Sequence, residues 1–108
     1  MAKELTVFRE FIGDNPTTRL LEFLIEGRSF DYTLTELAEK SEISWKTLHR
    51  IFPRFIKMKI VKQTRTVGRA KLFTLNTENP RVEKLIELFD RLLEQDTKEM
   101  EEHLLIKA

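Results

Sequence analysis

The positive charge of this chain is concentrated in residues 44–77. This segment holds nine Lys and Arg residues and no Asp or Glu, whereas residues 1–43 and residues 78–108 each carry five basic and nine acidic side chains. The net charges of the three parts are therefore −4, +9 and −4, in keeping with the +1 of the whole chain. Clustered Lys and Arg side chains bind phosphate groups, so the cluster predicts a polyanionic partner. A solvated basic face that pairs with acidic neighbours explains the charge alone equally well.

Catalytic and metal-binding chemistry has little support in the sequence. The chain has no Cys, and its two histidines, His49 and His103, lie far apart and outside any metal-ligand spacing. No Gly-rich phosphate loop is present, and the carboxylates fall on charged helical faces. We therefore expect neither an enzyme nor a bound cofactor or metal ion.

Length and composition predict one globular domain over residues 1–108. A chain of 108 residues, 41% of them hydrophobic, is long enough to bury one core. No apolar run approaches the ~20 residues of a membrane-spanning helix. The first ten residues lack the apolar stretch of a signal peptide, and the absence of Cys suits a reducing compartment. These features predict a cytoplasmic protein without a membrane segment.

The basic residues must be positioned by helices and strands that hydrophobic spacing and capping residues reveal. Ser44 is a helix cap, and the helix it opens extends to about residue 58. One face of this helix is apolar, with Leu48, Ile51, Phe52, Phe55 and Ile56. The opposite side carries Lys46, Arg50, Pro53 and Lys57. Pro53 lies inside the helix and predicts a kink, because it lacks a backbone N–H.

Two further helices are expected before this one. Asn15 and Pro16 open the first, and Gly27 ends it in a left-handed conformation. Residues 29–33 read as extended, and Thr33 with Glu36 three residues later forms a capping box for a second helix over residues 34–40. Residues 4–12 fit either a short helix or a strand.

After the basic helix the hydrophobic period changes. Two β-prone runs, within residues 60–75, flank a turn at Val67–Arg69 in which Gly68 is free to adopt positive φ. Asn79 and Pro80 then open a last helix that reaches about residue 94. Met100, Leu104 and Leu105 are compatible with a longer helix.

This order of elements resembles the winged helix-turn-helix family of DNA-binding transcriptional regulators and is similar to its small archaeal members. The stretch "LTELAEKSEISWKTLHRIF" (residues 34–52) resembles the two helices and their turn, and "IVKQTRTVGRAKLFTLN" (residues 60–76) resembles the wing. The resemblance implies a mostly α-helical fold with a small β-hairpin (α+β), in which residues 15–78 form the winged-helix core and residues 79–108 an added C-terminal helix. Glu42 stands where the family commonly has Gly, which costs about 1 kcal/mol if that residue is left-handed.

The resemblance also implies which residues contact double-stranded DNA. The helix of residues 44–58 would enter the major groove, and the hairpin of residues 60–75 would meet the backbone or the minor groove. The expected DNA contacts are Ser44, Trp45, Lys46, Thr47, His49, Arg50, Arg54, Arg65, Arg69 and Lys71. Arg50 is the candidate for a bidentate contact to guanine, and Thr47 for a contact to a thymine methyl group. Trp45 has an alternative role as a cover of the core.

A homodimer is expected because the last helix has an apolar stripe and few neighbours in its own domain. The stripe consists of Val82, Leu85, Ile86, Phe89, Leu92 and Leu93, with possible help from Leu5, Phe8, Phe11 and Ile12. A two-fold dimer would place two reading helices about 34 Å apart, on successive major grooves. The alternative is packing within one chain, with residues 95–108 frayed.

These observations predict a sequence-specific, double-stranded DNA-binding transcriptional regulator. Two alternatives stay open: a winged-helix module for protein–protein interaction, and a non-specific nucleic-acid binder. The sequence indicates no small-molecule effector.

Overall fold

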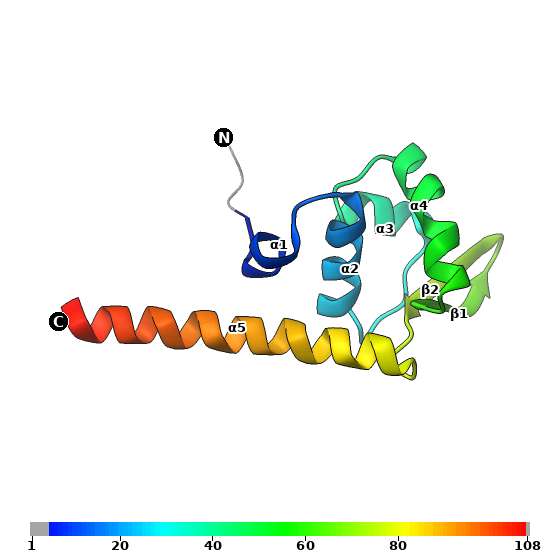
Figure 1. The fold of residues 1–108 in the computed structure, drawn as a ribbon. Helices are drawn as coiled ribbons and strands as arrows, with labels where there is room; N and C mark the ends of the chain where they lie inside the picture. Colours follow the sequence, from blue (N-terminus) through cyan, green and yellow to red (C-terminus); the bar gives the residue numbers. More distant parts are fainter. Residues whose placement is uncertain (1–4, 108) are drawn as a thin grey trace.

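A computed structural model describes residues 5–107 of the chain (Figure 1). In this part of the chain the elements are α1 (Val7–Ile12), α2 (Pro16–Glu26), α3 (Leu34–Lys40), α4 (Trp45–Lys57), β1 (Val61–Val67), β2 (Ala70–Leu75) and α5 (Pro80–Lys107). The expected fold, mostly α-helical with one small hairpin, is confirmed. None of the helices described is both long and apolar enough to cross a membrane.

Local side-chain caps begin the helices where the sequence places them. Asn15, Thr33 and Ser44 each accept a hydrogen bond from the backbone N–H three residues later, at 3.0, 3.2 and 3.0 Å. The capping box at Thr33 is complete, because Glu36 also accepts from the Thr33 N–H at 3.0 Å. Thr6 caps α1 in the same way, which resolves the ambiguity of this segment in favour of a helix.

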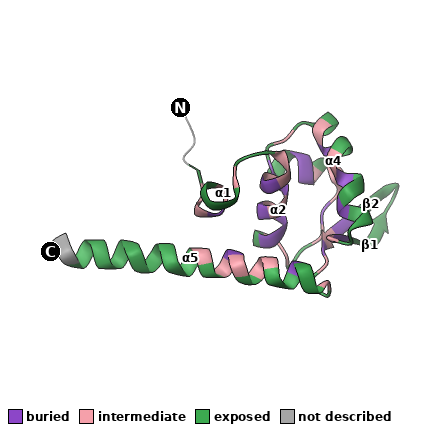
Figure 2. Ribbon diagram, in the orientation of Figure 1, coloured by how far each residue is buried: buried purple, intermediate pink, exposed green. Residues whose placement is uncertain are grey.

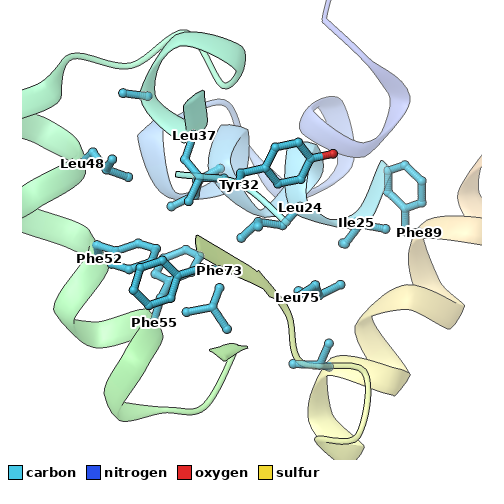
Figure 3. Close-up of a cluster of buried hydrophobic side chains, with 14 of the residues drawn as sticks. Leu24, Ile25, Tyr32, Leu37, Leu48, Phe52, Phe55, Phe73, Leu75 and Phe89 are labelled. Atoms are coloured by element: carbon cyan, nitrogen blue, oxygen red, sulfur yellow. The ribbon is translucent and has the colours of Figure 1, made fainter. Parts of the chain in front are cut away.

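The core lies between α2, α3, α4 and the hairpin, and Phe8 of α1 with Val82 and Phe89 of α5 extend it (Figure 3). Phe52 and Phe55 of α4 project toward β2, and the Phe52 ring meets the Phe73 ring edge-on at 5.0 Å. Leu48 is fully buried, whereas Ile56 is 50% exposed. The expectation that Ile56 lies on the buried face was therefore wrong. It lies about 80° around the helix from Leu48, at the edge of the apolar face nearest the hairpin.

The turn between α3 and α4 holds Glu42 in the left-handed conformation, which was expected to be strained for a residue other than glycine. Glu42 adopts φ 58°, which is left-handed. The turn closes through the Ile43 N–H, which donates to the Ala38 carbonyl at 3.0 Å, and through the Ser41 hydroxyl, which donates to the Leu37 carbonyl. The turn therefore has hydrogen bonds that help to offset the strain at Glu42.

The hairpin has one irregularity along its length. β1 and β2 pair antiparallel from Val61 with Leu75 to Val67 with Ala70, and Gly68 has φ 62° in the expected turn. The register shifts between Gln63 and Arg65, so Thr64 is bulged out of the ladder.

The segment before α3 pairs with the hairpin as a single bridge. The Tyr32 N–H donates to the Phe73 carbonyl and the Phe73 N–H to the Tyr32 carbonyl, both at 2.8 Å. The prediction of an extended segment over residues 29–33 is confirmed at Tyr32.

Gly27 ends α2 for a different reason from the one the sequence suggested. Its φ is −100°, so it is not left-handed. The site requires glycine because a Cβ added to Gly27 would lie 2.2 Å from the Tyr32 hydroxyl oxygen. That hydroxyl donates to the Gly27 carbonyl at 3.2 Å. Glycine at position 27 therefore permits the close approach of the Tyr32 hydroxyl group.

α5 is longer than the core it covers. It continues to Lys107, the longer of the two extents that the sequence allowed, and its residues 93–105 are all exposed (Figure 2). Val82 and Phe89 are only 2% and 4% exposed, and Phe89 packs edge-on against Phe8 of α1 at 5.4 Å. Their assignment to a dimer interface, together with Phe8, was therefore wrong, because they belong to the core of one chain. Leu85, Ile86 and Leu92 also pack partly on that core, while Leu93 is exposed.

The Gly27–Tyr32 contact can be tested by substitution. We expect Gly27→Ala to lower the free energy of unfolding by about 1–3 kcal/mol, because the added methyl group overlaps the Tyr32 hydroxyl. Adding Tyr32→Phe to this variant removes the overlapping oxygen and should recover part of the loss. Urea unfolding of the two single variants and the double variant measures the coupling. Additive effects would contradict the contact.

Candidate nucleic-acid interface

The outer face of α4 presents a row of exposed cations. Lys46, Arg50 and Lys57 are all exposed and lie within about 40° of arc, on the side opposite Leu48. They point away from the core because Leu48, Phe52 and Phe55 hold the other side of the helix against it. The expected division of this helix into a buried flank and a basic flank is confirmed.

The first turn of α4 is closed by hydroxyl groups. Ser44 Oγ accepts from the Thr47 N–H at 3.0 Å and donates to Thr47 Oγ1 at 2.8 Å. The Ser44 hydroxyl therefore serves as the cap, and the Thr47 side chain is half-buried beside it. Both residues remain at the end of α4 where a ligand can approach the backbone N–H groups.

Trp45 and His49 form one flank of α4. Their rings meet edge-on at 4.2 Å, and Trp45 is 51% exposed. Trp45, Phe52 and Ile56 line one side of a groove of about 400 Å³, and residues 69–71 of the hairpin line another. Trp45 thus borders the space between α4 and the hairpin and does not cover the core, the alternative considered for it.

Three of the expected contact residues lie on the hairpin, and they differ in whether their side chains are hydrogen-bonded to other described residues. Arg69 at the turn and Lys71 in β2 are exposed. Arg65, in contrast, is held by Asp31: its Nε donates to Oδ2 at 2.9 Å and its Nη2 to Oδ1 at 3.2 Å. Thr64 Oγ1 donates to the same Oδ2 at 2.6 Å.

Most cations of residues 44–77 have no side-chain partner in the described part of the protein. Among the residues that the structure describes, Arg65 and Lys62 are in ion pairs, Lys62 with Glu78 at 3.3 Å. Arg54 Nη2 donates to Thr17 Oγ1 at 3.0 Å. The other six form neither an ion pair nor a side-chain hydrogen bond in that part of the chain: Lys46, Arg50, Lys57, Lys59, Arg69 and Lys71. The alternative explanation of the charge, a basic face that pairs with acidic neighbours, therefore accounts for only two of the nine cations.

The hydrogen bonds to Asp31 affect its ionisation. The hydrogen bonds from Arg65 and Thr64 lower the pKa of Asp31 below its ordinary value. Asp14 is similar, because the hydrogen bond from Arg19 Nε at 2.8 Å lowers its pKa. Sequence reasoning missed Asp31, since its partner lies 34 residues away and no local pattern joins them.

A buried ion pair ties α1 to α2 away from this surface. Arg9 Nε lies 3.0 Å from Glu22 Oε1, and the Thr6 hydroxyl donates to Glu22 Oε2. Glu22 is buried, so this pair is a structural link and no part of the basic surface. Between residues 5 and 107 no three His, Cys, Asp or Glu side chains are placed to hold a metal ion.

Comparison with known proteins bears on the fold. No family model and no curated protein matches the chain. Solved structures do match, among them the antimony-specific transcriptional repressor AntR, at 25% identity and TM-score 0.58 over 78% of this chain and 72% of AntR. MepR, a transcription regulator of the Staphylococcus aureus multidrug efflux pump MepA, matches at 19% identity and TM-score 0.62 over 93% and 76% of the two chains. ZitR from Lactococcus lactis, in its apo form, matches at 18% identity and TM-score 0.63 over 91% and 80%.

This chain has a winged-helix fold. In it α3 and α4 form the helix-turn-helix, and the β1–β2 hairpin is the wing. The comparisons do not bear on the likeness to archaeal regulators, which stays a prediction.

The Asp31–Arg65 pair predicts a pH dependence of stability. A carboxylate whose pKa is lowered by folding stabilises the folded state above its unfolded pKa, and this contribution is lost as the pH falls through the lowered, folded pKa. We expect Asp31→Asn to unfold at lower urea concentration than the parent at neutral pH, and the difference to close below the ordinary pKa of 3.8. Glu94→Gln is the control, because Glu94 forms no ion pair among the described residues. A difference that persists unchanged in acid would contradict this assignment.

Proposed function

We propose that this chain is a cytoplasmic, sequence-specific double-stranded DNA-binding transcriptional regulator that acts by binding and not by catalysis. The observation that carries the proposal is the set of six unpartnered cations, four from Lys46 to Lys59 and two on the wing. The likeness to AntR, a transcriptional repressor, supports it.

The geometry suits reading of the major groove by α4. The groove admits one helix, and Lys46 and Arg50 stand on the outer side of α4 near its N-terminal end. Arg50 is the candidate for bidentate hydrogen bonding to guanine, and Lys46 and Lys57 for phosphate contacts. Arg69 and Lys71 would meet the flanking backbone or the minor groove from the wing.

Charge reversal on α4 tests DNA binding. We expect Lys46→Glu with Arg50→Glu to weaken binding at least about 100-fold, because two contacts become repulsive, while the urea midpoint changes little at these exposed sites. Duplexes recovered by selection from genomic fragments supply the ligand, and fluorescence anisotropy measures affinity. Arg91→Glu with Lys98→Glu makes the same charge change on exposed residues of α5 and should bind nearly as the parent does. Equal affinities of the two double variants would overturn the proposal.

Salt dependence and competitor duplexes separate specific from non-specific binding. Six phosphate contacts per protomer predict that log K falls with log salt at a slope near −5. A specific regulator should prefer its selected site over a random duplex by about 1,000-fold or more at fixed salt. No preference would favour the non-specific binder, and no binding to either duplex would favour the protein-interaction module.

We further propose that the chain forms a homodimer through the C-terminal part of α5. Leu93, Met100 and Leu104 lie within about 40° of arc on one side of α5, and this side continues the line of Val82 and Phe89. Val82 and Phe89, in the first half of the line, are buried in the core, where Phe89 meets Phe8 of α1, and the second half is exposed.

A second copy is the occupant that this geometry favours. Phe11 and Ile12 of α1, a helix that packs on α5, are also exposed and would add apolar area to such an interface. A stripe that one copy of the chain leaves open along a helix about 42 Å long is covered when two copies pack about a two-fold axis. Such a dimer would set the two α4 helices on successive major grooves, about 34 Å apart.

Sedimentation tests the dimer. We expect the parent to sediment as twice its 12.9 kDa at micromolar concentration, and Met100→Glu with Leu104→Glu to sediment as a folded monomer. Lys98→Glu is the control, since Lys98 lies about 160° around α5 from Met100. A monomeric parent would end this part of the proposal without affecting the assignment of the DNA-binding surface.

A further inference from the structure

Asp31 makes the only side-chain hydrogen bonds between the tip of the wing and the rest of the described protein. Residues 65–71 are all exposed, and in the described part of the chain Arg65 is the one residue among them whose side chain bonds outside the hairpin. Its two hydrogen bonds to Asp31 are joined by the bond from Thr64, which is the bulged residue of β1. Asp31 therefore contacts β1 at the point where its ladder is interrupted.

The segment that carries Asp31 is itself fixed to β2 on either side. Tyr32 exchanges two backbone hydrogen bonds with Phe73, and Thr74 Oγ1 donates to the Phe30 carbonyl at 2.8 Å. Tyr32 is buried in the core, where its ring packs edge-on against Phe23 of α2 at 4.8 Å. Asp31 thus lies in a segment that is hydrogen-bonded to β2, and its side chain contacts β1 from there.

We propose that Asp31 positions the wing for DNA binding by holding Arg65 in place. Arg65 then anchors the wing to the domain and does not contact DNA. This inference rests on the proposed function. A bulge bends and twists a strand, and a bidentate Arg–carboxylate pair constrains both distance and plane. Together they set the angle at which Arg69 and Lys71 leave the body of the domain relative to α4. Because Arg65 is exposed, the ion pair makes only a small contribution to overall stability, and its larger consequence is in the geometry of the wing.

The arrangement also explains why Arg65 differs from its neighbours in the sequence. Its Nε and Nη2 both point at Asp31, so one of the guanidinium edges that can form bidentate contacts is already occupied. Arg69 and Lys71 have no such partner within residues 5–107. The two kinds of cation on the wing therefore have different roles: one is structural, and two are available to phosphates.

Matched variants separate positioning from direct contact. If Asp31 positions the wing, Asp31→Ala and Arg65→Gln each weaken binding to the selected duplex by about 5- to 20-fold, the equivalent of one or two phosphate contacts, and the double variant is no weaker than either single one. If Arg65 instead contacts a phosphate, Asp31→Ala frees it and tightens binding, and Arg65→Gln lowers the salt slope by about 0.9. The second pattern would overturn the proposal.

Glu78→Ala is the control for charge. Glu78 pairs at 3.3 Å with Lys62, which lies in β1 as Arg65 does, so this variant also removes one carboxylate from beside the wing. It should bind DNA at least as well as the parent, because it only raises the net positive charge. A loss equal to that of Asp31→Ala would mean that any acid beside the hairpin has the same effect, and the proposal would be abandoned.

Amide hydrogen exchange tests, in the absence of DNA, whether Asp31 anchors the wing. We expect Asp31→Ala to speed exchange of the cross-strand amides between Arg65 and Lys71 by about 3-fold or more, while amides of α4 keep the parent's rates. Unchanged exchange in the wing would overturn the proposal. Faster exchange in a protein whose parent fails to bind any duplex would retain Asp31 as the wing's anchor and discard the DNA-binding function.

Discussion

The burial of one flank of α4 is the constraint on which the rest of the structure depends. Leu48, Phe52 and Phe55 take up the side of this helix that faces α2, α3 and β2 (Figure 3). A rigid helix has no freedom to turn once these side chains are packed. The opposite flank, with Lys46 and Arg50, is therefore aimed into solvent by the core itself. Any ligand of the basic flank meets a surface whose direction was set by hydrophobic contacts that the ligand never touches.

Charge pairing then sorts the cations of the molecule by role. Arg9, Arg19 and Arg65 meet carboxylates, at 3.0, 2.8 and 2.9 Å for the respective pairs with Glu22, Asp14 and Asp31. The Arg9–Glu22 and Arg65–Asp31 pairs join separate segments of the fold, whereas the Arg19–Asp14 pair is local to the start of α2. Among the described residues, the unpartnered cations of α4 and the wing have no carboxylate within ion-pair distance, and residues 44–77 themselves supply none. Their repulsion is relieved only by an external anion, which is the physical reason for expecting a phosphate backbone there.

α5 shows how one apolar stripe serves two purposes. Its first half, through Val82 and Phe89, is buried in the core and packs on α1, so the helix is anchored within one chain. The same line continues through Leu93, Met100 and Leu104 into a part that the described chain does not cover. The helix is thus both a wall of the domain and, in our proposal, the interface to a second copy. A single hydrophobic period along the sequence does not distinguish the two, because burial depends on what else reaches the stripe.

Local chemistry accounts for what the sequence alone determined. Caps such as Asn15, Thr33 and Ser44 act on N–H groups three residues away, the apolar face of α4 repeats every turn, and Gly68 allows the hairpin turn, so these features need only nearby residues. Tertiary structure alone decided the features that join distant parts of the chain. The burial of Phe89 by Phe8, the requirement for glycine at position 27 beside Tyr32, and the capture of Arg65 by Asp31 each depend on two segments meeting in space. No periodicity or spacing encodes such a meeting, because it arises only once the core has packed.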